Sequence, residues 1–125
     1  KQNLYKTTRL SAEECRRIQH DLDKLMQTSK PYTNPDLKSQ TLADMIGVSA
    51  HDLSFFFNQY LEKSYYDYVN EYRVNEFKRV AAEVDVSKYT LTALSQMCGF
   101  SSRATFFRHF KAVTGITPAE YLKRD

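Results

Sequence analysis

The sequence has few of the residues that build strand-rich, disulfide-bonded or membrane-embedded proteins. Only three glycines and three prolines occur among 125 residues, which disfavours an all-β chain with many tight turns. The two cysteines, Cys15 and Cys98, lie far apart in helical patterns, whereas a disulfide framework or a zinc site needs more ligands at closer spacing. No apolar run approaches the length that spans a bilayer, and there is no signal peptide. Because the two cysteines are too far apart in the sequence for such a framework, both are expected to be free thiols of a protein in a reducing compartment.

Patterns that carry catalysis or bind cofactors are also missing. The sequence shows no paired carboxylates in a cleft-like context, no glycine loop for phosphate and no nucleophile elbow. Neither His20 nor His109 has a partner at the spacing of a metal site or a catalytic triad. We therefore expect neither an enzyme nor a site for a cofactor, metal ion or small molecule in this chain.

Positive charge is concentrated at the two ends of the chain. The net charge is only +3, and the hydrophobic fraction of 42% is that of an ordinary globular protein. Residues 1–35 carry seven basic against four acidic residues, 36–70 carry two against five, 71–100 carry four against four, and 101–125 carry five against two. A basic terminus favours nucleic acid, although so small an excess is weak support by itself.

The strongest internal signal is a repeat of about half the chain. Its first part aligns Thr41–Ser49 with Ala93–Ser101 at an offset of 52 residues, as from Leu42 to Leu94. Further along the offset is 53, and the matched pairs are Phe57 with Phe110, Ser64 with Thr117, Asp67 with Glu120, and Tyr68 with Tyr121. One unit is therefore used twice, with one extra residue in the second copy.

Each repeat unit has the pattern of a helix, a tight turn and a second helix. Helical spacing gives the first helices the apolar stripes Leu42, Met45, Ile46 and Leu94, Met97, Cys98. Gly47 and Gly99 follow where the chain must turn, and Gly47 is expected to have a positive φ. Ser49 and Ser101 then stand as N-caps, with Asp52 completing a capping-box pattern in the first unit. The second helices bury Leu53, Phe56 and Phe57 in one unit, and Phe106 and Phe110 in the other.

A long helix joins the two units. Helical spacing of apolar residues runs from Tyr68 to Val84, after the capping pattern that starts at Ser64. Upstream, Ser11 opens a capping box for an amphipathic helix that ends before Pro31, and Tyr32 to Pro35 is expected to be a loop. We predict seven helices and no strand: an all-α fold of two helix-turn-helix subdomains (homeodomain-like) joined by a linker helix, with an extra N-terminal helix. The predicted parts are a lead-in at 1–35 and a domain at 36–125, divided into 36–65, a linker at 66–84, and 85–125.

These residues resemble the AraC/XylS family of bacterial transcription regulators. The match is carried by Thr41–Ser49, Tyr72-Arg73-Val74, Gly99–Ser102, Phe106–Lys111 and Thr114–Tyr121. It covers about residues 37 to 122, and the second-half signature is highly specific. The resemblance implies that two helix-turn-helix units read adjacent major grooves of double-stranded DNA, and that a sensing domain lies outside this region. Because the sequence starts at Lys1 rather than Met, we expect a piece of a longer protein.

The second recognition helix is expected to supply most of the DNA contacts. Arg103 and Arg108 are the best candidates for reading bases, since Arg pairs bidentately with guanine. Lys111 is expected to contact phosphate, as are backbone N–H groups near Ser101 and Thr117. His109 is a weaker candidate for a phosphate contact. The remaining predicted contacts on this helix are Ser102, Ala104 and Phe107.

The first recognition helix departs from the family pattern. Its matching positions are His51, Ser54, Phe55 and Asn58, of which His51 and Asn58 are able to hydrogen-bond to bases. Phe55 stands where the family often has a polar or basic residue, and it is expected to touch thymine methyl groups or to pack on a partner. We predict that this acidic unit contributes less to affinity than the second.

Two other functions stay open from the sequence. One is a protein-interaction module that has lost DNA binding but kept the fold; the other, less favoured, is an enzyme. For the main interpretation, the expected partners are double-stranded DNA, RNA polymerase and a second copy that pairs through regions outside this chain. The expected location is the cytoplasm, either as a free regulator or as the cytoplasmic part of a membrane-anchored sensor. The second possibility comes from the N-terminal helix and the Lys30-Pro31-Tyr32 stretch, which resemble the lead-in of family members with a membrane-anchored sensor.

Overall fold

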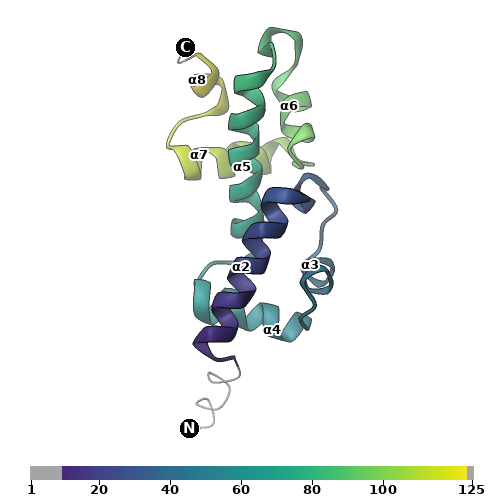
Figure 1. The fold of residues 1–125 in the computed structure, drawn as a ribbon. Helices are drawn as coiled ribbons and strands as arrows, with labels where there is room; N and C mark the ends of the chain where they lie inside the picture. The colour runs from purple at the N-terminus through teal and green to yellow at the C-terminus, as the bar shows by residue number, and fades with distance from the viewer. Residues whose placement is uncertain (1–9, 124–125) are drawn as a thin grey trace. The chain divides into compact units, whose positions relative to one another are not determined.

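The computed structural model describes residues 10–123, and within this range the chain is helical without a strand. Figure 1 shows its seven α-helices: α2 (Ala12–Thr28), α3 (Ser39–Ile46), α4 (Ala50–Phe55), α5 (Tyr65–Glu83), α6 (Leu91–Met97), α7 (Arg103–Thr114) and α8 (Pro118–Lys123). Two 3₁₀ turns, at Pro31–Thr33 and Val86–Lys88, and a π-helical segment at Phe56–Leu61 lie between them. The predicted all-α class with two helix-turn-helix units, α3–α4 and α6–α7, is confirmed.

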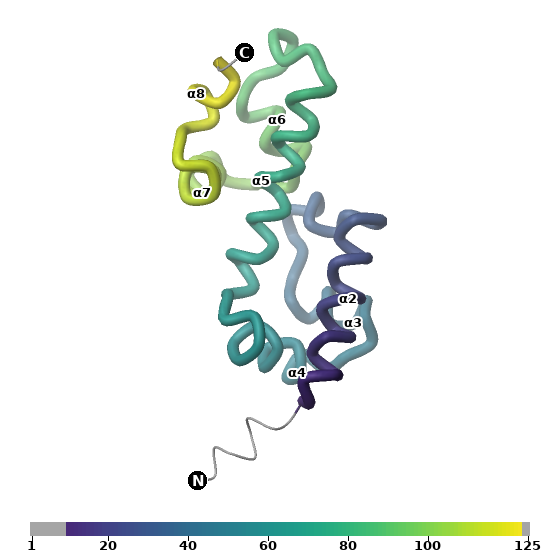
Figure 2. Tube along the Cα trace, turned by 60° about the vertical axis from the view of Figure 1, so that its left-hand side comes forward, coloured from purple at the N-terminus to yellow at the C-terminus, as the bar shows by residue number. Residues whose placement is uncertain are grey.

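The described chain forms two compact units. The first contains the residues up to Pro31 together with Leu37–Tyr65, so the N-terminal helix α2 packs with α3 and the π-helical segment. The second contains Tyr32–Asp36 and the chain from Tyr66 onward. The connection between α2 and α3, which Figure 2 follows as a tube, therefore belongs in part to the second unit.

The core of the first unit is built on one face of α2. The helix begins with a complete capping box, in which Ser11 Oγ accepts from the Glu14 N–H at 3.0 Å and the Ser11 N–H donates to Glu14 Oε1 at 2.8 Å. Its helically spaced apolar residues are buried, as are those of α3, α4 and the π-helical segment: Cys15, Ile18, Leu22, Met26, Leu42, Leu53, Phe56 and Phe57. The predicted stripe of the first recognition helix is confirmed.

The core of the second unit is aromatic. Phe77 of α5 lies with its ring centroid 5.0 Å from that of Phe106 and 5.4 Å from that of Phe110, both on α7. Cys98 is fully buried in the same cluster, where burial raises the pKa of its thiol to about 12. Cys98 is thus a core residue, as its match to Ile46 in the repeat predicts.

The expectation that Met45 and Met97 belong to the apolar stripes is wrong. Their exposed fractions are 50% and 46%, so these repeat mates share an exposed position rather than a buried one. The core side of α3 is completed instead by Ala43, which is fully buried. On α6 the matching position is Ser95, which is buried while its hydroxyl donates to the Thr92 carbonyl.

The turn of the second unit is one residue longer than predicted. The N-cap of α7 is Ser102, not Ser101, whereas Ser49 caps α4 as expected. The additional residue lies within the turn, where Phe100 is buried against the ring of Phe106 at 5.1 Å. This residue accounts for the change of the repeat offset from 52 to 53.

The stretch from Tyr32 to Pro35, expected to be a loop, begins within the 3₁₀ turn at Pro31–Thr33. Arg73 of α5 binds this stretch: its Nε donates to the Tyr32 carbonyl at 2.7 Å and its Nη2 donates to the Asn34 carbonyl at 3.0 Å. Gly99 lies against the same carbonyl, and a Cβ at this position would overlap the Tyr32 oxygen and approach Arg73 Nε within 2.8 Å. We call Tyr32, Arg73 and Gly99 the clamp of the second unit.

Candidate nucleic-acid interface

Helix α7 is the second helix of the second helix-turn-helix unit. Its start is fixed by Ser102, whose Oγ accepts from the Thr105 N–H at 3.2 Å, and its end by Gly115 in the left-handed conformation with φ 85°. Phe106 and Phe110 anchor one face in the core. The exposed outer face is therefore held toward solvent in a single orientation.

The predicted contact residues of α7 share this outer face. Arg103, Ala104, Arg108 and Lys111 are exposed, Phe107 is half-buried, and Ser102 is exposed at the cap. Spacings of one, four, five and eight residues from Arg103 place the side chains along one stripe of the helix. The first turn contains no acidic residue, so the helix dipole, its free N–H groups and the Arg103 charge all favour an anion at this end.

Arg103 is held by two neighbours. Its Nη1 donates to Oγ1 of Thr92 in α6 at 3.3 Å, and its guanidinium carbon lies 5.0 Å from the ring centroid of Phe107. The second distance is within the range of a cation–π interaction. The guanidinium therefore has a defined position at the start of α7.

The side chain of His109 contacts Asn70 of α5. Asn70 of α5 uses its Oδ1 to accept from Arg73 Nη1 at 2.9 Å, which leaves its NH₂ group to face His109 Nε2 at 3.3 Å. A ring nitrogen that accepts this bond carries no proton, so the arrangement favours neutral imidazole. Burial and then the charge of Arg108 lower the pKa of His109, with a smaller contribution from Arg73 and an opposing one from Asp67. The expectation of a phosphate contact is not supported, because Nε2 faces Asn70.

The first recognition helix exposes a less basic surface. His51, Ser54 and Asn58 are exposed and Phe55 is half-buried. Asn58 Nδ2 donates to Ser54 Oγ at 3.4 Å, so the structure brings these two predicted residues together across one turn. The helix α4 changes to a π-helical segment at Phe56 and ends at Glu62, which has a left-handed φ of 55°.

The start of α8 is already occupied by its own cap. The Thr117 N–H donates to Glu120 Oε1 at 2.9 Å, and Thr117 Oγ1 accepts from the Glu120 N–H at 3.1 Å. These bonds lower the pKa of Glu120, so a carboxylate stands where a phosphate was expected. The expected phosphate contact near Thr117 is therefore not supported.

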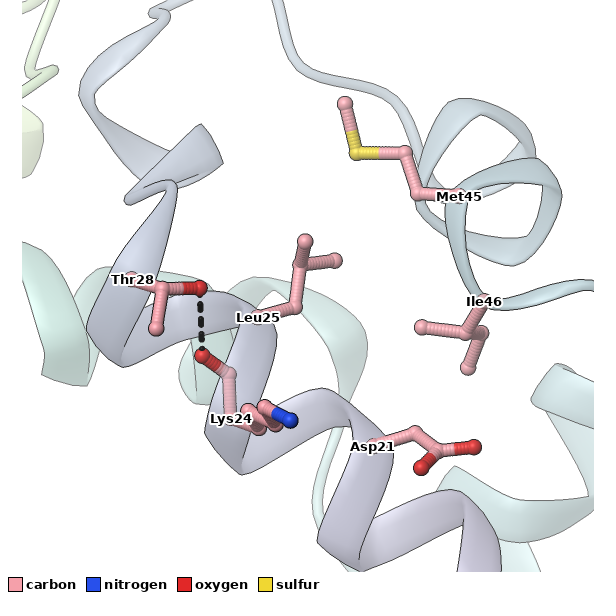
Figure 3. A pocket seen from close by; sticks show the side chains of 6 residues that line it. All are labelled: Asp21, Lys24, Leu25, Thr28, Met45 and Ile46. Carbon is pink, nitrogen blue, oxygen red and sulfur yellow. Dashed lines mark hydrogen bonds between the residues drawn. The ribbon is translucent and has the colours of Figure 1, made fainter.

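A surface pocket of about 340 Å³ lies between α2 and α3 in the first unit (Figure 3). Its lining residues are Asp21, Lys24, Leu25, Thr28, Met45 and Ile46. Its polar side-chain groups are the Asp21 carboxylate, the Lys24 amine and the Thr28 hydroxyl, and the last of these donates to the Lys24 carbonyl at 2.8 Å. The pocket accounts for Met45, whose side chain lines its wall instead of the core. Within residues 10–123, no group of three or more metal-binding side chains occurs.

Sequence reasoning missed Thr92 and the role of Arg73. Arg73 belongs to a motif that carried the family resemblance, and a charged residue between apolar positions of a long helix was a usable signal. Its exposed fraction is only 9%, and all its described bonds are made inside the second unit. Thr92 gave no signal, because its role depends on how α6 lies beside α7.

The chain is similar in sequence to known helix-turn-helix proteins. Residues 42–124 match the family described as the helix-turn-helix domain. The chain is 31% identical over 104 residues to the probable transcription factor PqrA of Proteus vulgaris, covering 83% of this chain and 82% of that protein. It is also 31% identical over 90 residues to an uncharacterized HTH-type transcriptional regulator of Staphylococcus aureus, of which it spans only 12%.

Two solved structures share the fold. A protein of unknown function from Listeria innocua is 29% identical, with a TM-score of 0.66 over 85% of this chain and 94% of its own. The C-terminal domain of AraT, a response regulator from Geobacillus stearothermophilus, gives the same TM-score of 0.66 at 19% identity, over 89% of this chain and 84% of its own. Among the described helices, none is both long enough and apolar enough to cross a membrane. The chain belongs to the AraC-type helix-turn-helix family of DNA-binding transcription regulators, and not to a family of enzymes.

Proposed function

We propose that this chain recognises specific DNA sequences by inserting α7 and α4 into successive major grooves of one duplex. The observation that carries the proposal is the outer face of α7, where Arg103, Arg108 and Lys111 are exposed along the helix, from a first turn without acidic residues to the last turn. A major groove admits an α-helix and displays a distinct donor and acceptor pattern for each base pair. A basic helix face of this kind fits such a groove.

Each proposed DNA contact of α7 and its cap has a separate role. Arg103 and Arg108 read guanine through O6 and N7, and Lys111 neutralises a phosphate, which positions the protein without reading sequence. Ala104 and Phe107 offer apolar contact to thymine methyl groups, and the hydroxyl of Ser102 is placed beside the backbone of the DNA.

The first unit is proposed to make a smaller contribution. His51 and the bonded pair Ser54 and Asn58 are able to hydrogen-bond to base edges, while Phe55 offers only apolar contact. Asp52 in the first turn of α4 adds a negative charge close to the proposed contacts and repels phosphate. Affinity is therefore expected to depend mainly on α7.

The length of α5 is compatible with two adjacent grooves. A helix of 19 residues is about 28 Å long at 1.5 Å per residue. Successive major grooves on one face of a duplex lie about 34 Å apart, so we expect the DNA to bend somewhat.

The test begins with a duplex selected by this chain from a random library. Hydroxyl-radical footprinting should show two protected patches about one helical turn apart, and affinity should fall log-linearly with salt concentration. Inserting about half a helical turn between the two halves of the site should remove the contribution of the first unit. A single protected groove would contradict two-groove recognition, and salt-independent binding without sequence preference would favour a protein-interaction module instead.

We propose further that the chain is the output domain of a larger regulator in the bacterial cytoplasm. Its partners there would be RNA polymerase and a second copy that pairs through regions outside this chain. The support is that PqrA is named as a probable transcription factor, while the matching Staphylococcus aureus regulator is a much longer protein.

A further inference from the structure

We propose that Thr92, together with Phe107, is a specificity-determining positioning residue that holds the guanidinium of Arg103 for base recognition. Thr92 lies in the first turn of α6 and Arg103 is the first residue of α7, so the contact joins the two helices of the unit. This inference rests on the proposed function, because it assigns a geometry to a residue that the proposal uses to read DNA.

The two contacts restrict the guanidinium in different ways. The Thr92 hydroxyl accepts from Nη1 at 3.3 Å and fixes one edge of the group, while the ring of Phe107 at 5.0 Å supports its face. A guanidinium has five N–H donors in a rigid fork. The bond to Thr92 uses one of them and leaves the edge formed by Nε and Nη2 for the O6 and N7 atoms of guanine.

The charge of Arg103 does not stabilise α7 through the helix dipole. A positive charge at the start of a helix is opposed by the helix dipole, and the first turn of α7 contains no acidic residue that would offset it. An unrestrained arginine would turn toward water or toward the nearest phosphate. Contacts that keep Arg103 in place at the helix start therefore favour a defined base contact over a general electrostatic one.

The first unit supports the inference because it lacks all three residues, Thr92, Arg103 and Phe107, at the matching positions. At the matching positions it has Gln40 for Thr92, Ala50 for Arg103 and Ser54 for Phe107. The Gln40 amide instead donates to Asp44 Oδ1 at 2.9 Å, within its own helix. The three residues are therefore not required by the fold, which both units share.

The experiment measures discrimination, not affinity alone. The selected duplex is compared with all its single-base-pair variants in competition binding, for the unaltered chain, Arg103→Ala, Thr92→Val and Thr92→Ser. Valine keeps the shape of threonine without the hydroxyl, and serine keeps the hydroxyl. We expect Arg103→Ala to reduce discrimination about five- to hundredfold at one base pair. Thr92→Val should reduce it about three- to tenfold at that same base pair only, and Thr92→Ser should preserve it.

The outcomes separate the two proposals. If Arg103→Ala changes discrimination at no base pair, base reading by Arg103 fails and the inference fails with it. If Arg103→Ala acts at one base pair while Thr92→Val acts at none, or weakens all sites equally, only the inference is overturned. The double variant Arg103→Ala, Thr92→Val should discriminate no worse than Arg103→Ala, since Thr92 acts through the arginine.

A measurement on the free chain covers the case in which Thr92→Val perturbs folding. NMR relaxation of the Arg103 Nε–H group should show a more restricted side chain in the unaltered chain and in Thr92→Ser than in Thr92→Val. Phe107→Leu should loosen it as well, because leucine keeps apolar bulk but lacks the aromatic face. An arginine that is equally mobile in all four proteins would contradict the positioning role.

Discussion

The two recognition helices share what they bury and differ in what they expose. Each starts at a capping serine, Ser49 or Ser102, and each sends matched side chains into its core. In α4 the first turn then carries Asp52, whose charge suits the helix dipole, whereas in α7 the first residue is Arg103, whose charge opposes it. The repeat thus preserves the residues that fold a unit, while the exposed residues of the two helices differ in charge.

The units also differ in how firmly their turns are held. The turn of the second unit closes on the clamp, where Gly99 lies against the Tyr32 carbonyl and Arg73 binds the same oxygen. The matching Gly47 of the first unit also has a left-handed φ, of 74°, but a Cβ there would meet no non-neighbouring atom of the described residues within 4 Å. The more basic recognition helix thus follows the more constrained turn.

The largest expected effect compares alanine at these two glycines. Gly99→Ala should destabilise the protein by about 3 kcal/mol or more, since left-handed strain is joined by overlap with backbone. Gly47→Ala should cost only the left-handed strain, about 1–2 kcal/mol. Urea unfolding of both variants measures the difference. Equal losses would mean that the Tyr32 segment moves aside freely and that the clamp contributes little.

The next effect tests which helix dominates DNA binding. Arg108→Ala should weaken binding to the selected duplex by about 1–3 kcal/mol and should reduce the salt dependence if the arginine also meets phosphate. Phe55→Ala, at the matching position of α4, should cost less than about 1 kcal/mol, the loss of an apolar contact. Affinities at several salt concentrations measure both. A loss for Phe55→Ala as large as that for Arg108→Ala would contradict the predicted asymmetry.

Periodicity and capping chemistry were enough to predict much of the fold. The stripe of Leu53, Phe56 and Phe57 and the cap at Ser49 depend on neighbours within one helix, and both are found as predicted. Met45 and Met97 were misassigned because helical spacing shows which residues share a face but not how wide the buried part of that face is. The width depends on the neighbouring helices.

The interface was predictable only as far as it is local. The stripe of α7 follows from the helix register, so the exposure of Arg108 and Lys111 on its outer face was predictable, while their contact with DNA stays a prediction. The prediction of a cap at Ser101 is wrong because Ser101 and Ser102 are both able to cap a helix, and the sequence does not show where the extra residue of the repeat lies. The contact of Thr92 with Arg103 joins residues eleven positions apart through a turn, and no pattern in the sequence reports it.

A smaller effect concerns how the recognition helices end. Gly115 ends α7 with φ 85°, while Glu62 occupies the matching position after α4 with φ 55°. A residue with a Cβ is strained in this conformation, so Glu62→Gly should stabilise the protein by about 1 kcal/mol. Thermal unfolding measures the gain. Glu62→Ala is the control, because it removes the charge but keeps the strain; a gain in this variant as well would assign the effect to charge.

The smallest effect is a pH dependence specific to the second unit. Burial and the charge of Arg108 lower the pKa of His109 in the folded chain, with Arg73 acting in the same direction and Asp67 against it. The unfolded chain then binds more protons than the folded one between the lowered pKa and the ordinary value of about 6.5, so stability rises with pH in that window.

This contribution is complete above about pH 6.5 and is lost as the pH falls through the folded pKa of His109. Protonation would also turn the Nε2 acceptor of the Asn70 bond into a donor that faces an NH₂ group. Urea midpoints between about pH 5 and pH 7.5 should therefore rise less steeply in His109→Gln than in the unaltered chain. If His109→Gln leaves the slope unchanged, the pH dependence does not arise from the contact between α7 and α5.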